Sequence, residues 1–142
     1  MTVIAWDGKS LAADRQCTIG GTASRVRKVH KVISPTDGRI FLVGLAGSEI
    51  DATAFLRWMR GDTGKPSDLT DLNAMVIDQR KRLWVVSQKL VYVRRFERLW
   101  AIGSGADYAL GAMHLGKTAE QGVRLACKLS IECGLGVDVV RF

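Results

Sequence analysis

The sequence predicts an α+β fold in which helices pack on antiparallel sheets. Strand-like segments fill most of residues 2–45, and turn signals typical of antiparallel hairpins separate them. Helical patterns follow these strands and return as a pair near the end, so strands and helices do not alternate as in parallel βαβ folds. With 142 residues, of which 47% are hydrophobic, we expect one domain over residues 1–142.

Two hairpins are expected at the start of the chain. Asp7-Gly8 is a dipeptide favoured in tight hairpin turns, and it separates two short apolar segments. Residues 35–38, Pro-Thr-Asp-Gly, give a second turn signal. A loop rich in Gly and Thr, residues 18–23, is expected between the two hairpins. The expected strands are residues 2–6, 10–14, 26–33 and 39–45.

One helix is expected directly after these strands. Ser48 and Asp51, three residues apart, form a capping-box pattern; apolar residues follow at helical spacing, and Gly61 ends the pattern. Residues 61–72 contain Gly and Pro and are expected to form a loop. The strands expected next are residues 74–78, 83–87, 90–93 and 99–102.

Two further helices are expected near the end of the chain. Ser104 is the expected N-cap of the first, with Asp107 three residues later and Gly116 beyond its end. Thr118 is the expected N-cap of the second, and Gln121 lies three residues later. The last expected strand covers residues 137–142.

Composition excludes several classes of protein. The 21 basic residues exceed the 14 acidic ones, and the net charge of +7 permits binding to acidic partners without requiring it. No apolar run approaches the roughly 20 residues of a membrane helix, and we expect neither a secretory signal nor a membrane partner. The cysteines lack zinc-site spacing, so we expect free thiols, a cytoplasmic location and no metal or other cofactor. They are Cys17, Cys127 and Cys133.

The N-terminal pair Met1-Thr2 is the first candidate for chemistry. Threonine is small enough for methionine aminopeptidase to remove the residue before it. The hydroxyl of Thr2 would then share its residue with a free α-amine, whose pKa is about 7.7–8.0. That amine can accept the hydroxyl proton without a histidine. The plain alternative is an ordinary protein start.

Charged residues inside apolar strands are the second candidate. Asp14 ends the second expected strand, and Lys28 lies between Val26 and Val29 in the third. A lysine close to an amine nucleophile would lower the pKa of both groups by like-charge repulsion, and an aspartate could hold that lysine in place. The alternative is a solvated face, because residues 25–31 are rich in Arg and Lys.

Glycines next to the expected helix starts are the third candidate. Gly44 to Ser48 lies where a strand changes to a helix, so backbone N–H groups there could stabilise an oxyanion. Gly103-Ser104-Gly105 is a similar segment, which fits either a helix cap or a reactive hydroxyl. Read alone, both segments fit simple turns.

Taken together, these segments resemble the proteasome β-subunit family, and above all the bacterial HslV-type peptidase and short bacterial and phage proteasome-like proteins. The order and spacing of the motifs carry the resemblance, which spans nearly the whole chain. The motifs are Thr2, Leu11 to Asp14, Lys28-Val29, Gly44 to Gly47 with Asp51, Ala101 to Gly105 with Tyr108-Ala109, and Cys133 to Val140.

The resemblance implies a fold and a set of roles. The fold is the four-layer αββα sandwich of N-terminal nucleophile (Ntn) hydrolases, with a reduced helical layer because residues 61–72 leave no room for a second helix there. The implied roles are Thr2 as nucleophile and base, Asp14 and Lys28 in tuning it, Ser104 near its amine, Gly47 N–H as oxyanion hole, and Thr18, Leu45 and Ala46 in substrate binding. Leu45 favours an apolar preference in the first specificity pocket.

The implied function is a threonine-type peptidase that acts on peptides or unfolded proteins inside a homo-oligomeric ring. The ring would be hexameric, heptameric or double, and an ATPase unfoldase is a partner that the analogy suggests. One alternative is an inactive scaffold of the same fold, because Ser130 stands where the family has an aspartate and Cys133 where it has a hydroxyl. A second is a nucleic-acid-binding module, since Arg94-Arg95 and Trp84 combine basic and aromatic side chains. A solvated basic face is the simpler interpretation of that segment.

Overall fold

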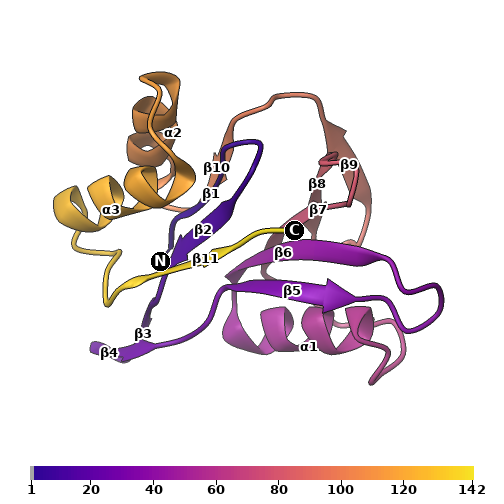
Figure 1. The fold of residues 1–142 in the computed structure, drawn as a ribbon. Helices are drawn as coiled ribbons and strands as arrows, with labels where there is room; N and C mark the ends of the chain where they lie inside the picture. The colour runs from indigo at the N-terminus through magenta and orange to yellow at the C-terminus, as the bar shows by residue number, and fades with distance from the viewer. Residues whose placement is uncertain (1) are drawn as a thin grey trace.

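The computed structural model describes residues 2–142, and Met1, on which the expected processing depends, lies outside the described residues. Two antiparallel sheets stack face to face with helices on both outer sides, which confirms the expected αββα sandwich (Figure 1). The elements are β1 (Ile4–Trp6), β2 (Leu11–Asp14), β3 (Gln16–Ile19), β4 (Thr22–Arg25), β5 (Val29–Ile33), β6 (Ile40–Gly47), α1 (Glu49–Met59), β7 (Leu72–Ile77), β8 (Leu83–Ser87), β9 (Tyr92–Arg95), β10 (Trp100–Ile102), α2 (Ala106–His114), α3 (Ala119–Leu129) and β11 (Val137–Val140).

Both sheets are built from antiparallel pairs. The first sheet has the strand order β10-β1-β2-β11, and the second has the order β5-β6-β7-β8-β9. Helices α2 and α3 cover the outer face of the first sheet, while α1 covers that of the second (Figure 1). Among residues 2–142, the chain between α1 and β7 forms no second helix, as the reduced helical layer implied.

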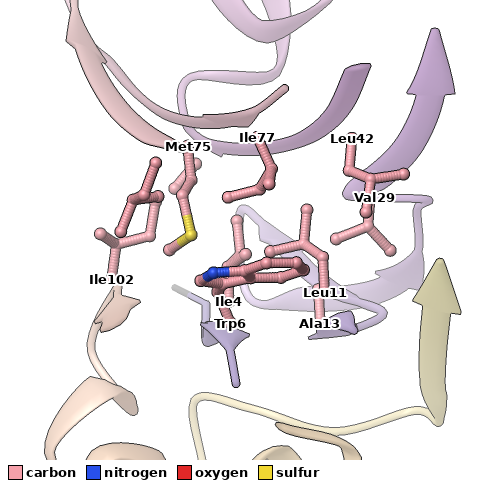
Figure 2. Close-up of a cluster of buried hydrophobic side chains, with 11 residues drawn as sticks. Ile4, Trp6, Leu11, Ala13, Val29, Leu42, Met75, Ile77 and Ile102 are labelled. Carbon is pink, nitrogen blue, oxygen red and sulfur yellow. The ribbon is translucent and has the colours of Figure 1, made fainter. Parts of the chain in front are cut away.

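The main core lies between the two sheets (Figure 2). Side chains alternate along a strand, so Ile4 and Trp6 face the second sheet while Val3 and Ala5 face α2 and α3. Because both faces of β1 are covered, this strand is apolar throughout rather than alternating with polar residues. The residues labelled in this core are Ile4, Trp6, Leu11, Ala13, Val29, Leu42, Met75, Ile77 and Ile102.

The structure corrects the expected loop at residues 18–23. Strands β3 and β4 pair there as a hairpin, and Gly20 and Gly21 form its turn with φ of 55° and 83°. Strand β4 is exposed along its whole length, so it lacks the buried face that gives other strands a hydrophobic pattern. Two strands begin later than expected: β5 begins at Val29 and not at residue 26, and β9 begins at Tyr92 and not at residue 90.

Two helix starts agree with the sequence signals. The hydroxyl of Ser48 accepts a hydrogen bond from Asp51 N (3.1 Å) and caps α1. Thr118 and Gln121 form a complete capping box at the start of α3. The helices of residues 2–142 are 9 or 11 residues long, and none is long and apolar enough to cross a bilayer.

The expected cap at Ser104 is wrong. Helix α2 has Gly105 as its N-cap residue, and no side chain caps it. The hydroxyl of Ser104 accepts a hydrogen bond from Thr2 N instead (3.2 Å). A contact across 102 residues of sequence has therefore replaced a local one.

Candidate active site

The first hairpin brings Thr2 and Asp14 together. Asp7-Gly8 turns the chain so that β1 and β2 pair with Ile4 opposite Ala13. One step further along this ladder, Asp14 N donates to Val3 O (3.3 Å), which places Asp14 beside Thr2. The Thr2 hydroxyl donates to Asp14 Oδ1 at 3.1 Å. The hairpin register therefore sets the distance between a hydroxyl and a carboxylate.

The Asp14 carboxylate is the centre of a buried polar network. Its side chain is fully buried, and Lys28, which forms an ion pair with it, is 8% exposed. A buried carboxylate is stable only when its oxygens accept hydrogen bonds. Both oxygens of Asp14 do so. The donors are Thr2 Oγ1 (3.1 Å), Val3 N (3.1 Å) and Lys28 Nζ (2.8 Å) to Oδ1, and Gln16 N (3.2 Å) and Gly134 N (3.1 Å) to Oδ2.

Strand β10 brings Ser104 to Thr2 from the opposite side. It pairs with β1 through Ile4 and Ile102, so the chain after Ile102 lies beside Thr2. Gly103 has φ of +97°, and a Cβ there would come within 2.2 Å of Thr2 O. The Ser104 hydroxyl donates to Thr2 O (3.3 Å) while accepting from Thr2 N (3.2 Å). The backbone of Thr2 is therefore held by a glycine turn that only a residue without a side chain fits.

The segment after α3 supplies a thiol to this network. Cys133 is buried, and burial, with a further contribution from the charge of Asp14, raises the pKa of its thiol. Hydrogen bonds with the side chains of Ser130 and Ser104 act in the opposite direction. Glu132, the nearest carboxylate in this segment, is exposed, and its backbone N–H donates to Ser130 Oγ (3.2 Å). The hydroxyl of Ser130 thus stands where the resemblance implied a carboxylate, and the thiol of Cys133 stands where it implied a hydroxyl.

A pocket of about 620 Å³ opens beside Thr2. The residues predicted from the sequence that line it lie just before β1, just before β5, at the end of β6 and between β10 and α2, and most of the lining is apolar. Those residues are Thr2, Lys28, Leu45, Ala46, Gly47 and Ser104. Within residues 2–142 its lining includes Gln16 and Cys17 of β3 but not Thr18, whose side chain is exposed.

Several lining residues were not predicted from the sequence. Arg27, His30 and Glu49 lie at the pocket, as do Asp71 and Asn73, which reach it because β7 pairs with β6. Burial lowers the pKa of His30, and the nearby charge of Arg60 adds to this effect. No local motif marks Asp71 and Asn73, because the pairing of β6 with β7 joins segments separated by a helix and a loop.

Gly47 lies at the end of β6, where the strand meets the cap of α1. Its φ is +103°, and a Cβ on it would come within 2.3 Å of Asp71 O. Ser48 N donates to that same carbonyl (2.9 Å). The position therefore requires glycine for both reasons, conformation and space. Gly47 and Thr2 line the same pocket.

Comparison with known proteins shows the likeness at the level of structure. Neither a protein-family model nor a curated protein matches the sequence. Solved structures do match it. BPH from Thiobacillus denitrificans, in complex with epoxomicin, is 21% identical with a TM-score of 0.75, covering 100% of this chain and 98% of that one.

Two further structures are proteins of other types. HslV from Trypanosoma brucei is 17% identical with a TM-score of 0.64, covering 98% of this chain and 97% of that one. Anbu from Pseudomonas aeruginosa, described as a helical assembly, is 13% identical with a TM-score of 0.69, covering 100% of this chain and 81% of that one. The chain therefore has the fold of proteasome-like Ntn hydrolases, as its motifs implied. Its structural neighbours are of the HslV and Anbu types.

Proposed function

We propose that the chain is an N-terminal threonine peptidase. One observation carries this proposal: both reactive groups of Thr2, which lines the pocket, are hydrogen-bonded, its hydroxyl to Asp14 and its nitrogen to Ser104. The likeness in fold to proteasome-like proteins agrees with it. A hydroxyl and an amine on one residue supply a nucleophile and a base together.

The reaction would follow the removal of Met1, which turns the Thr2 nitrogen into a free α-amine. The amine accepts the hydroxyl proton while Oγ1 of Thr2 attacks the carbonyl carbon of the scissile bond. The tetrahedral intermediate collapses, the C–N bond breaks, and the leaving nitrogen takes the proton back from the α-ammonium. Water then attacks the resulting ester and gives a proton to the amine, so that a carboxylic acid leaves and the hydroxyl is restored.

The other residues act on this pair in the proposal. Lys28 lowers the pKa of the amine by like-charge repulsion, and Asp14 holds Lys28 and the hydroxyl in place. Ser104 orients the amine. The N–H of Gly47 stabilises the oxyanion, an interaction that is commonly worth about 3–4 kcal/mol.

Substrate binding in the proposal uses the apolar wall of the pocket. Leu45 and Ala46 lie in that wall and favour an apolar side chain before the scissile bond. Thr18 lies in the exposed second half of β3, where it could pair with the backbone of an extended substrate. A library of fluorogenic peptides tests this preference. Cleavage mainly after Lys or Arg would contradict it and would point to Glu49, which also lines the pocket.

Oligomeric assembly belongs to the proposal as well. A site of this kind without a barrier would degrade folded neighbours, and a ring of subunits would enclose it. Anbu from Pseudomonas aeruginosa forms a helical assembly, so a protein of similar fold assembles into an oligomer. Native mass spectrometry of the purified protein gives the subunit number, and a monomer at micromolar concentration would contradict the proposal.

Intact-mass spectrometry before and after epoxomicin tests the chemistry. Epoxomicin is the compound bound in the structure of BPH from Thiobacillus denitrificans. We expect loss of the Met1 mass and one adduct per chain, and no adduct on Thr2→Ala. Retention of Met1, or processing without an adduct, would favour the alternative of an inactive scaffold. The hydroxyl and thiol of Ser130 and Cys133 are the observation behind that alternative.

A further inference from the structure

Asp51 is a buried carboxylate whose hydrogen bonds go to a distant loop. It lies in the first turn of α1 and is 6% exposed. The capping-box pattern predicts that its side chain returns to the residue before the helix. Its Oδ2 instead accepts N–H groups from Thr70 (2.7 Å) and Asp71 (2.7 Å). Only the Ser48 half of the pattern is used for capping.

Residues 70–71, which Asp51 holds by hydrogen bonds, contact the turn that contains Gly47. Asp71 O accepts a hydrogen bond from Ser48 N (2.9 Å), and the same carbonyl fills the space where a Cβ of Gly47 would lie. The next residue, Leu72, pairs with Gly47 in the β6–β7 ladder. The backbone of Asp71 and Leu72, at the start of β7, therefore fixes the orientation of the Gly47 peptide group. Asp51 in turn holds this segment through its hydrogen bonds to Thr70 and Asp71.

We propose that Asp51 is a positioning residue for the oxyanion-binding N–H of Gly47, an inference that rests on the proposed peptidase function. The carboxylate accepts both loop N–H groups on one oxygen, and charge-assisted hydrogen bonds of this length are stronger than neutral ones. Its position in the first turn of a helix also favours a negative charge. Loss of the carboxylate frees residues 70–71 and lets the Gly47 turn move by the fraction of an ångström that oxyanion binding does not tolerate.

Steady-state kinetics on the full, assembled protein test this inference. Asp51→Asn keeps the shape but replaces the charge, and Asp51→Ala removes the acceptors. We expect kcat to fall by about 10-fold in the first and by about 100-fold in the second, with KM unchanged, because an oxyanion donor acts on the transition state. Asp62→Asn, an exposed acid of the same loop, is the matched control and should keep wild-type kcat.

The measurement separates positioning from simple destabilisation. Active sites are counted by epoxomicin adducts, so that kcat is expressed per reactive Thr2, and melting temperatures are recorded for every variant. A lower melting temperature with wild-type kcat per reactive site would overturn the inference, as would a rise in KM alone. Both results would mean that Asp51 supports the fold or substrate binding and not the oxyanion site.

Failure of the proposed function is recognised separately. A wild-type protein without turnover or adduct would overturn the peptidase proposal and, with it, the catalytic part of this inference. Hydrogen exchange then decides the structural part. We expect faster exchange of the Ser48, Thr70 and Asp71 amides in Asp51→Asn than in Asp62→Asn. Equal exchange in the two variants would show that Asp51 does not hold the turn.

Discussion

The ion pair of Asp14 and Lys28 is the residue-scale feature on which the proposed site depends most. Both charges are removed from water, and their attraction alone rarely compensates for that loss. Backbone N–H groups of Val3, Gln16 and Gly134 compensate for the rest of the desolvation cost, because they donate hydrogen bonds to the Asp14 carboxylate in addition to the one from Lys28. The network is therefore stable as a unit and vulnerable to the loss of one member.

Lys28→Met should lower the free energy of unfolding by about 3–5 kcal/mol, because it leaves a buried carboxylate without its counter-charge. The double variant Lys28→Met, Asp14→Asn should recover part of this loss. Arg39→Met, which breaks the exposed pair with Asp37, is the control and should cost less than about 1 kcal/mol. Urea denaturation measures all of them. If the single and double variants were equally destabilised, the buried charge would not be the cause.

At the scale of elements, the turn of the first hairpin is tied to helix α3. Oδ1 of Asp7 accepts from Lys9 N (2.8 Å) and Ser10 N (2.8 Å) within the turn. Its Oδ2 accepts from Ser10 Oγ (2.9 Å) and from Ala119 N at the start of α3 (2.8 Å). Burial alone would raise the pKa of Asp7, but these hydrogen bonds lower it below its ordinary value of 3.8.

Asp7→Asn should destabilise the protein by about 2 kcal/mol at pH 7, because an amide NH₂ replaces one of the two acceptors. The folded-state pKa of Asp7 lies below its unfolded value, so its contribution is complete above pH 4 and is lost as the pH falls through the lowered pKa. The difference in melting temperature between wild type and variant should therefore shrink below pH 4. A constant difference from pH 7 to pH 3 would contradict this account.

At the scale of the whole molecule, the net charge is concentrated at one end of the second sheet. Residues 79–99 contain seven basic residues and one acidic residue, which gives +6 of the total of +7. Arg94 lies over the rings of Trp84 (5.6 Å) and Phe96 (4.8 Å). The chain's own arginine therefore occupies the ring faces on which bases would stack, and the segment fits a solvated basic face better than a nucleic-acid module.

This concentration of charge should make stability depend on ionic strength. Raising salt screens repulsion among Lys81, Arg95 and Arg98, which border one small pocket, so the melting temperature should rise by a few degrees. The double variant Arg95→Gln, Arg98→Gln should show a smaller rise. Lys117→Gln, Arg141→Gln removes the same charge elsewhere and serves as the control. Equal salt dependence in both double variants, measured by thermal scans, would argue against a local cause.

The sequence alone determined the parts of this protein that depend on neighbouring residues. The hairpin that joins Thr2 to Asp14 follows from Asp7-Gly8 and two short apolar strands. The starts of α1 and α3 follow from Ser48 and Thr118, whose hydroxyls bond N–H groups three residues away. Each of these features is formed by residues that lie close together in the chain, so a short sequence pattern is enough to predict it.

Hydrogen-bond partners that lie far apart in the sequence follow from the strand pairing. The local pattern predicted Ser104 as a helix cap, whereas the family resemblance placed it near the Thr2 amine. Ser104 bonds Thr2 because β10 pairs with β1. Asp51 was expected in a capping box and instead holds Thr70 and Asp71, because β7 returns beside β6. In both cases a local hydrogen bond and a distant one compete for the same oxygen. The strand pairing that buries the core selects between them, and a linear pattern carries no information on that pairing.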